Sequence, residues 1–229
     1  MREESQVIVT IDGPSGVGKS TISRRVAAWL GFTYLDTGAM YRAVALYCKI
    51  KNLDISDSTN LDQELEHIEL ELFPAKNHHD DVRVVLNNED ISTRIRTPEI
   101  SMLASQVSAL QKVREKLTRM QQDLGFKGRI VAEGRDTGTV VFPNAAFKFY
   151  LDASPRERTS RRAKQLRALG REVDEKELLE MTLARDKNDS ERALAPLKVA
   201  ADAIYIDTTT LSADQVLAEL QKHLKNARG

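Results

Sequence analysis

Apolar and polar positions change their spacing several times along the chain. β-branched and other apolar residues dominate 7–11, which is typical of a buried parallel strand. Ile22, Val26 and Trp29 then recur on one helical face, and Gly31 is suited to a helix C-cap. The start of the chain therefore predicts a strand, a glycine-rich turn and a helix.

The same alternation continues along most of the chain. Further strands are predicted over 32–36, 129–133, 146–151 and 203–207. Helices are predicted up to about Ile50 and from Thr97, Ser154, Asp174 and Ser212. Ser108 and Gln111 have the spacing of an internal capping box, so the stretch after Thr97 is compatible with one helix or two. Strands that alternate with helices predict an α/β fold, a parallel sheet flanked by helices.

Two segments interrupt this pattern in charge. Residues 60–97 read as strands around a polar loop and are rich in acids, which predicts a small β-rich insertion. The stretch 154–171 is instead rich in arginine. A basic helix is often only a helix with a solvated face. In a chain that also binds a triphosphate, an arm of arginines over the phosphates is the stronger interpretation.

Composition places the chain among globular proteins. It has 229 residues, 41% hydrophobic and 30% charged, with a formal net charge of +0. This balance favours neither a nucleic acid nor a membrane as partner. Cys48 is the only cysteine, which favours a reducing compartment, and we expect a cytoplasmic protein. The pair His78–His79 stands in a polar stretch without zinc-site spacing and is interpreted as a solvated loop.

The turn between the first strand and helix carries the clearest chemistry. Gly13-Pro14-Ser15-Gly16-Val17-Gly18-Lys19-Ser20 matches the pattern GxxxxGK(S/T), and Thr21 follows it. Glycines let backbone N–H groups surround an anion, and the next helix N-terminus adds a positive dipole end. Lys19 supplies charge for the β- and γ-phosphates, and the Ser20 hydroxyl suits Mg²⁺. The turn therefore predicts a triphosphate-binding loop.

This loop alone does not define a reaction, because switches, motors and kinases share it. A regulatory protein that binds GTP would need a guanine-reading NKxD motif. The nearest string, DKND at 186–189, has the wrong order.

Six motifs together make the chain similar to one family. They are IDGPSGVGKST at 11–21, LDTGAMYRA at 35–43, ASQVSALQKVR at 104–114, AEGRDTGTVVFP at 132–143, LDAS with ERTSRR at 151–162, and RDKNDSERALAPL at 185–197. The chain resembles the bacterial cytidylate (CMP) kinases over essentially its whole length. Kinases for UMP, dTMP or AMP, which differ in their base contacts, remain the nearest alternatives.

The resemblance implies a P-loop kinase with a five-stranded parallel core. Residues 1–59 and 98–229 would form that core, with an Arg-rich lid at about 154–171. Residues 60–97 would form an inserted domain that binds the nucleoside monophosphate. The implied reaction converts ATP and CMP or dCMP to ADP and CDP or dCDP with Mg²⁺. We expect a monomer.

The resemblance also implies roles for individual residues. The CMP phosphate would contact Arg42, Arg135 and Arg192. The cytosine would contact Thr37, Ser105, Arg114 and Asp136, and the sugar would contact Arg185 and Asp189. Lid groups on ATP would be Arg158, Arg161 and Arg162. Lys19, Arg135, Arg158, Arg162 and Arg192 would be catalytic. Glu133 lies where P-loop proteins often carry an acid that holds Mg²⁺, directly or through water.

Overall fold

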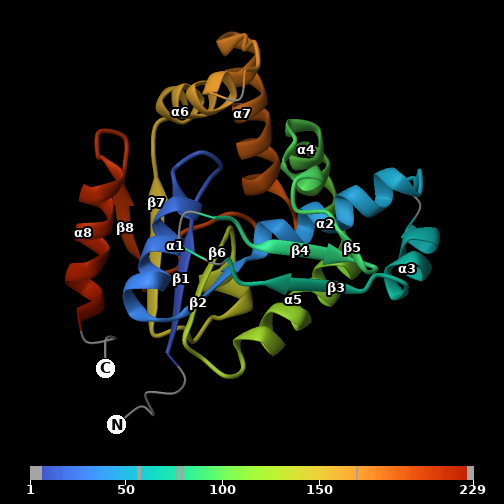
Figure 1. Ribbon diagram of the computed structural model, residues 1–229, viewed down its shortest axis with the longest axis horizontal. Helices are drawn as coiled ribbons and strands as arrows, with labels where there is room; N and C mark the ends of the chain where they lie inside the picture. The colour runs from blue at the N-terminus through green and yellow to red at the C-terminus, as the bar shows by residue number, and fades with distance from the viewer. Residues whose placement is uncertain (1–6, 56–57, 76, 78–79, 169, 226–229) are drawn as a thin grey trace. The chain divides into compact units, whose positions relative to one another are not determined.

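The computed structural model describes residues 7–55, 58–75, 77, 80–168 and 170–225, shown in Figure 1. The chain divides into two compact units, the first formed by Met1–Tyr34 and Lys127–Gly229 and the second by Leu35–Phe126. The pair His78–His79 lies outside the described residues. None of the helices in the described ranges is long and apolar enough to cross a membrane.

A five-stranded parallel sheet with the order β2-β6-β1-β7-β8 confirms the predicted fold class. Its strands are β1 (Ile8–Asp12), β2 (Thr33–Asp36), β6 (Ile130–Gly134), β7 (Phe147–Asp152) and β8 (Ile204–Asp207). Each lies within one residue of the range that the alternating pattern predicted for it. The central strand β1 pairs with β6 and β7, and its Val9 and Ile11 are fully buried, as a parallel core strand requires.

Helices of the first unit cover this sheet. Helix α1 (Lys19–Leu30) contacts β1, β6 and α8 (Ala213–Leu224). Gly31 ends α1 in the left-handed conformation, as predicted. Ser212 and Gln215 form a capping box at the predicted start of α8. Local capping signals therefore identified the C-terminal end of α1 and the N-terminal end of α8.

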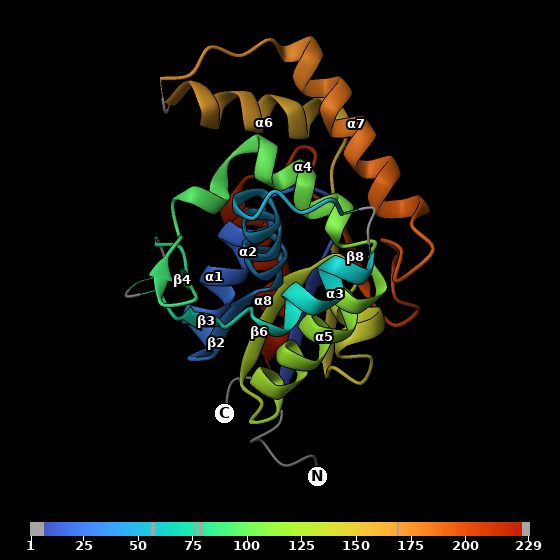
Figure 2. The same cartoon turned by 90° about the vertical axis from the view of Figure 1, so that its right-hand side faces the viewer.

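The basic stretch forms one arm of a helical hairpin in the first unit (Figures 1 and 2). Helix α6 (Pro155–Ala168) packs against α7 (Glu175–Glu191). The Ser154 hydroxyl accepts from the Glu157 N–H at the start of α6, and Asp174 caps α7 through two N–H groups. Both helix starts were predicted from the sequence.

The second unit contains helices and a small antiparallel sheet. The sheet has the order β3-β4-β5, and helix α2 contacts β4, α4 and α5. Its elements are α2 (Thr37–Ile50), α3 (Ser58–Glu66), β3 (Leu70–Phe73), β4 (Arg83–Leu86), β5 (Glu89–Asp90), η2 (Arg94–Arg96), α4 (Pro98–Val107) and α5 (Gln111–Gly125). The sheet lies inside the predicted insertion; the role of 60–97 as a monophosphate-binding domain stays a prediction.

Two local features differ from the expectations. The stretch after Thr97 forms two helices, but Leu110 precedes α5 at the N-cap position, and the Ser108 hydroxyl donates to the Ser105 carbonyl instead of forming a capping box. Helix α3 was not predicted. Buried Leu61 and Leu65 on one face give it a helical spacing that the acidic composition obscured.

Candidate functional site

The glycine-rich loop joins β1 to α1 in the first unit. A Cβ atom at Gly13 would lie 2.0 Å from the Leu151 carbonyl oxygen, so the loop leaves β1 where no side chain fits. Gly18, in the left-handed conformation with φ 96°, stands at the N-cap of α1. The loop therefore ends at a helix N-terminus, which favours an anion.

Lys19, in the first turn of α1, folds back onto this loop. Its Nζ donates to the Pro14 carbonyl at 2.7 Å, and the residue is buried. Burial, and next the positive charge of Arg135, hold the pKa of Lys19 well below its ordinary value. A polyanion beside Lys19 would offset both effects.

Ser20, the next residue of α1, contacts a buried acid from β6. The Ser20 hydroxyl donates to Glu133 Oε1 at 2.8 Å, and the Tyr34 hydroxyl donates to Oε2 of the same carboxylate at 2.8 Å. Hydroxyl and carboxylate oxygens suit Mg²⁺, which usually keeps several waters and phosphate ligands. No group of three or more His, Cys, Asp or Glu side chains in the described residues could hold a metal by itself. The Ser20–Glu133 pair fits a phosphate-bound Mg²⁺.

Two arginines of α6 donate to backbone carbonyls of the loop. Arg158 donates to the Ser15 carbonyl at 3.1 Å and pairs with both oxygens of Asp186 on α7. Arg161 donates to the Val17 carbonyl at 3.3 Å. Arg158 is 3% exposed and is therefore no solvated lid residue in this state; the predicted contacts of both arginines with ATP stay predictions.

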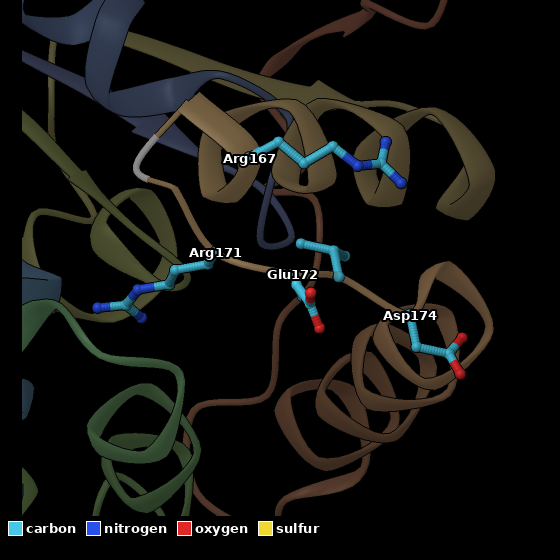
Figure 3. Close-up of a pocket in the computed structure, with 5 residues that line it drawn as sticks. Arg167, Arg171, Glu172 and Asp174 are labelled. Carbon is cyan, nitrogen blue, oxygen red and sulfur yellow. The ribbon is translucent and has the colours of Figure 1, made fainter.

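Arg162 lies one residue further and donates to Gln165 at 3.4 Å. Beyond it, an open hollow between α6 and α7 is lined by Arg167, Arg171, Glu172, Val173 and Asp174. Arg167 and Arg171 point in opposite directions there (Figure 3). Arg167 pairs with Glu175 at 2.7 Å. The hollow therefore lacks converging positive charges.

Predicted substrate residues of the first unit form ion pairs at the ends of β6 and α7. Arg135 Nε donates to Asp189 Oδ2 at 2.9 Å, and Arg192 lies 3.5 Å from Asp136. Arg185 donates to the Ser15 hydroxyl at 3.2 Å, next to the loop. Fold contacts therefore bring these predicted phosphate, sugar and base residues together on one unit.

The second unit brings together the other predicted substrate residues in two places. At the start of α2, Arg42 donates to Asp36 Oδ2 at 2.9 Å, beside buried Thr37. At the α4–α5 turn, the predicted residues Ser105 and Arg114 are both buried, and Arg114 donates to the Ser108 carbonyl at 3.0 Å. The Ser108 hydroxyl in turn donates to the Ser105 carbonyl.

Comparisons with known proteins decide the family. The family model described as cytidylate kinase matches residues 9–226. The chain belongs to the cytidylate kinase family. The cytidylate kinase of Thermodesulfovibrio yellowstonii is 48% identical over 94% of this chain and 96% of its own length. That of Carboxydothermus hydrogenoformans is 44% identical over 93% of this chain and 94% of its own length.

A solved structure agrees on the fold alone. The structure of an uncharacterized protein from Eubacterium ventriosum is 12% identical and has a TM-score of 0.51, with 96% of this chain and 99% of that chain covered.

Three residues near the loop of this cytidylate kinase family member were not predicted from its sequence. Asp12 is a charged residue at the end of an apolar strand, Tyr34 reaches Glu133, and Asp186 pairs with Arg158. Of these three residues, only Asp12 could have been found from the local sequence, because a buried carboxylate directly before a phosphate loop needs hydrogen-bond partners of its own.

Proposed function

We propose that this protein transfers the γ-phosphate of ATP to CMP or dCMP, giving ADP and CDP or dCDP. The match to the cytidylate kinase family model over residues 9–226 carries this proposal. The loop geometry at Lys19 agrees with a triphosphate donor, since a helix N-terminus and a buried ammonium converge there. ATP is the co-substrate that membership of a kinase family implies.

We assign the residues as their contacts support. Gly13–Thr21 hold the triphosphate, with Lys19 on the transferring group. Arg158 and Arg161 support the ATP site through loop carbonyls and, with Arg162, reach the nucleotide when the hairpin moves. Arg42, Arg135 and Arg192 bind the CMP phosphate, and Arg185 and Asp189 bind the sugar. Thr37, Ser105, Arg114 and Asp136 bind cytosine.

Phosphoryl transfer requires the protein to position the two substrates and to neutralise the charge on the transferring group. The CMP phosphate oxygen must lie in line with the γ-phosphorus, and the charge on the transferring oxygens must be neutralised. Lys19, Arg135 and Arg192 supply cationic groups for that task. A general base is not needed, because a phosphate monoester is already anionic near pH 7. Exclusion of water prevents simple hydrolysis of ATP.

We propose that Ser20 binds Mg²⁺ and that Glu133 holds the Ser20 hydroxyl, directly opposite Tyr34 on the same carboxylate. When bound, Mg²⁺ would neutralise charge on the phosphates. We further propose a monomer that acts on small molecules without nucleic acid or membrane, in the cytoplasm, in accord with a net charge of +0.

A panel of nucleotides tests the proposal. Purified protein with ATP and Mg²⁺ is assayed for diphosphate formation from CMP, dCMP, UMP, dTMP and AMP. We expect CDP and dCDP to form fastest. Equal use of another monophosphate would contradict the assignment of CMP and dCMP as the acceptor substrates. GTP binding without any diphosphate product would replace the kinase by a regulatory switch.

Loss of the Arg158 guanidinium should weaken ATP use more than CMP use. Arg158→Ala removes the donor to the Ser15 carbonyl and leaves the Asp186 carboxylate without this partner. We expect KM for ATP to rise about tenfold, KM for CMP to change little, and the free energy of unfolding to fall by about 1–3 kcal/mol. Steady-state kinetics and urea unfolding measure these effects.

Arg167→Ala on the same helix is the matched control, because Arg167 is half exposed and its ion pair with Glu175 lies at the surface. Its kinetics should match those of the wild type. If Arg158→Ala lost stability with both KM values unchanged, Arg158 would have no role at the ATP site.

A further inference from the structure

Asp12, the last residue of β1, carries a carboxylate buried in the first unit. Only 4% of the residue is exposed. Its Oδ1 accepts from the Thr137 N–H at 2.9 Å and from the Thr137 hydroxyl at 2.8 Å, and its Oδ2 accepts from the Gly138 N–H at 2.7 Å. Three short hydrogen bonds therefore join the strand before the phosphate loop to the segment after β6.

These donors begin the π-helical turn η3 (Thr137–Val141). The first N–H groups of a helical turn have no partner inside it, and an aspartate at the N-cap position usually accepts from them. Asp136 occupies that position, yet within the described residues its side chain makes no cap hydrogen bond, and it lies 3.5 Å from Arg192. Asp12, 124 positions earlier in the chain than Asp136, caps the turn in its place.

The turn has little room to adopt another position. A Cβ atom at Gly138 would lie 2.8 Å from Thr10 Oγ1 and 3.3 Å from both Asp12 Oδ2 and Lys148 Cδ. The turn contacts both β1 and β6. Burial raises the pKa of Asp12, and the bonds from Gly138 and Thr137 act in the opposite direction. The turn and the carboxylate thus stabilise each other.

Removal of the Asp12 carboxylate would leave two buried N–H groups at the start of the turn. A buried donor without an acceptor is unfavourable, so an acceptor close to the turn would replace it. The Asp136 carboxylate is covalently next to the turn, and a rotation of its side chain would bring an acceptor toward these N–H groups. Such a rotation would withdraw Asp136 from Arg192.

We propose that Asp12 is a positioning residue for CMP recognition, which caps the 137–141 turn so that the Asp136 carboxylate stays directed to Arg192 and the base. The inference rests on the proposed function, in which Asp136 reads cytosine. It gives the residue before the phosphate loop a role in choosing the acceptor nucleotide.

The test is a double-mutant cycle of Asp12→Asn and Asp136→Ala, with kcat/KM for CMP and for UMP as readouts. In Asp12→Asn the new amide group faces the Gly138 N–H, donor against donor. We expect kcat/KM for CMP to fall about tenfold or more with a lower CMP-to-UMP ratio. In the Asp136→Ala background, the same substitution should lower kcat/KM for CMP by less than about threefold, because the carboxylate that Asp12 positions is absent.

Asp207→Asn is the matched control. Asp207 ends β8 and likewise accepts from the N–H and hydroxyl of a threonine, Thr209, but it is exposed. Its kinetics should stay at the wild-type level. If Asp12→Asn fails to fold, Thr137→Val removes only the hydroxyl bond, with a smaller loss that Thr137→Ser restores and that the Asp136→Ala background abolishes.

Equal losses in both backgrounds, or an unchanged CMP-to-UMP ratio, would overturn the inference and leave Asp12 a general stabiliser of the fold. A separate result would affect the proposed function first. If Asp136→Ala alone left the use of CMP and UMP unchanged, Asp136 would not read the base, and Asp12 would have no base-reading group to position.

Discussion

Lys19→Ala is expected to lower kcat by about 10²-fold or more with CMP and ATP as substrates. The Lys19 ammonium is held at the loop by the Pro14 carbonyl, where the transferring phosphoryl group would lie. Charge that develops on the phosphoryl oxygens would lose a fixed cation. Initial-rate measurements at saturating concentrations of both substrates give kcat directly.

The fold of this variant should change little. The lowered pKa of Lys19 means that its charged form is less stable in the fold than in water, so removal of the charge should not cost stability. Lys222→Ala is the control, since Lys222 is exposed and pairs with Glu219 on α8. Near-normal kcat in Lys19→Ala would contradict the assignment of the loop.

Much of the first unit could be predicted because its signals are local. The strand-turn-helix at residues 7–31 follows from spacing, and the helix starts at Ser154, Asp174 and Ser212 follow from side chains that cap their own backbone. These interactions span only two or three residues. A sequence shows such pairs directly.

Features that depend on partners far away in the sequence could not be predicted from local pairs of residues. The 137–141 turn contains glycine and β-branched residues, and the acceptor that caps it is Asp12. Arg158 appeared as one of many arginines in a basic stretch, whereas its place is fixed by Asp186 and the Ser15 carbonyl. Tertiary contacts determine these features.

The wild-type protein should prefer CMP to UMP by about 10²-fold or more in kcat/KM. Cytosine presents an amino donor and a ring-nitrogen acceptor where uracil presents a carbonyl acceptor and an N–H donor. The Asp136 carboxylate can only accept, which suits the cytosine amino group. Uracil would place an acceptor against it, at a cost of about 1–3 kcal/mol for each lost partner, and two such mismatches give this ratio.

Asp136→Ala should narrow the ratio, mainly through loss of CMP activity. The substitution also removes the Asp136 carboxylate, which lies 3.5 Å from Arg192, a residue proposed to bind the CMP phosphate. That second effect is shared by both nucleotides, because CMP and UMP carry the same phosphate. The ratio of kcat/KM values therefore isolates the contact with the base from the contact with the phosphate.

Asp136→Asn sharpens the measurement, because it keeps the size of the side chain and replaces one acceptor by a donor. The amide group can donate to the uracil carbonyl, so this variant should use UMP better than Asp136→Ala does, while CMP still loses its charged acceptor. We expect the CMP-to-UMP ratio to decrease from wild type to Asp136→Ala to Asp136→Asn. An unchanged ratio in both variants, or a wild type that uses UMP as well as CMP, would refute the base-reading role of Asp136.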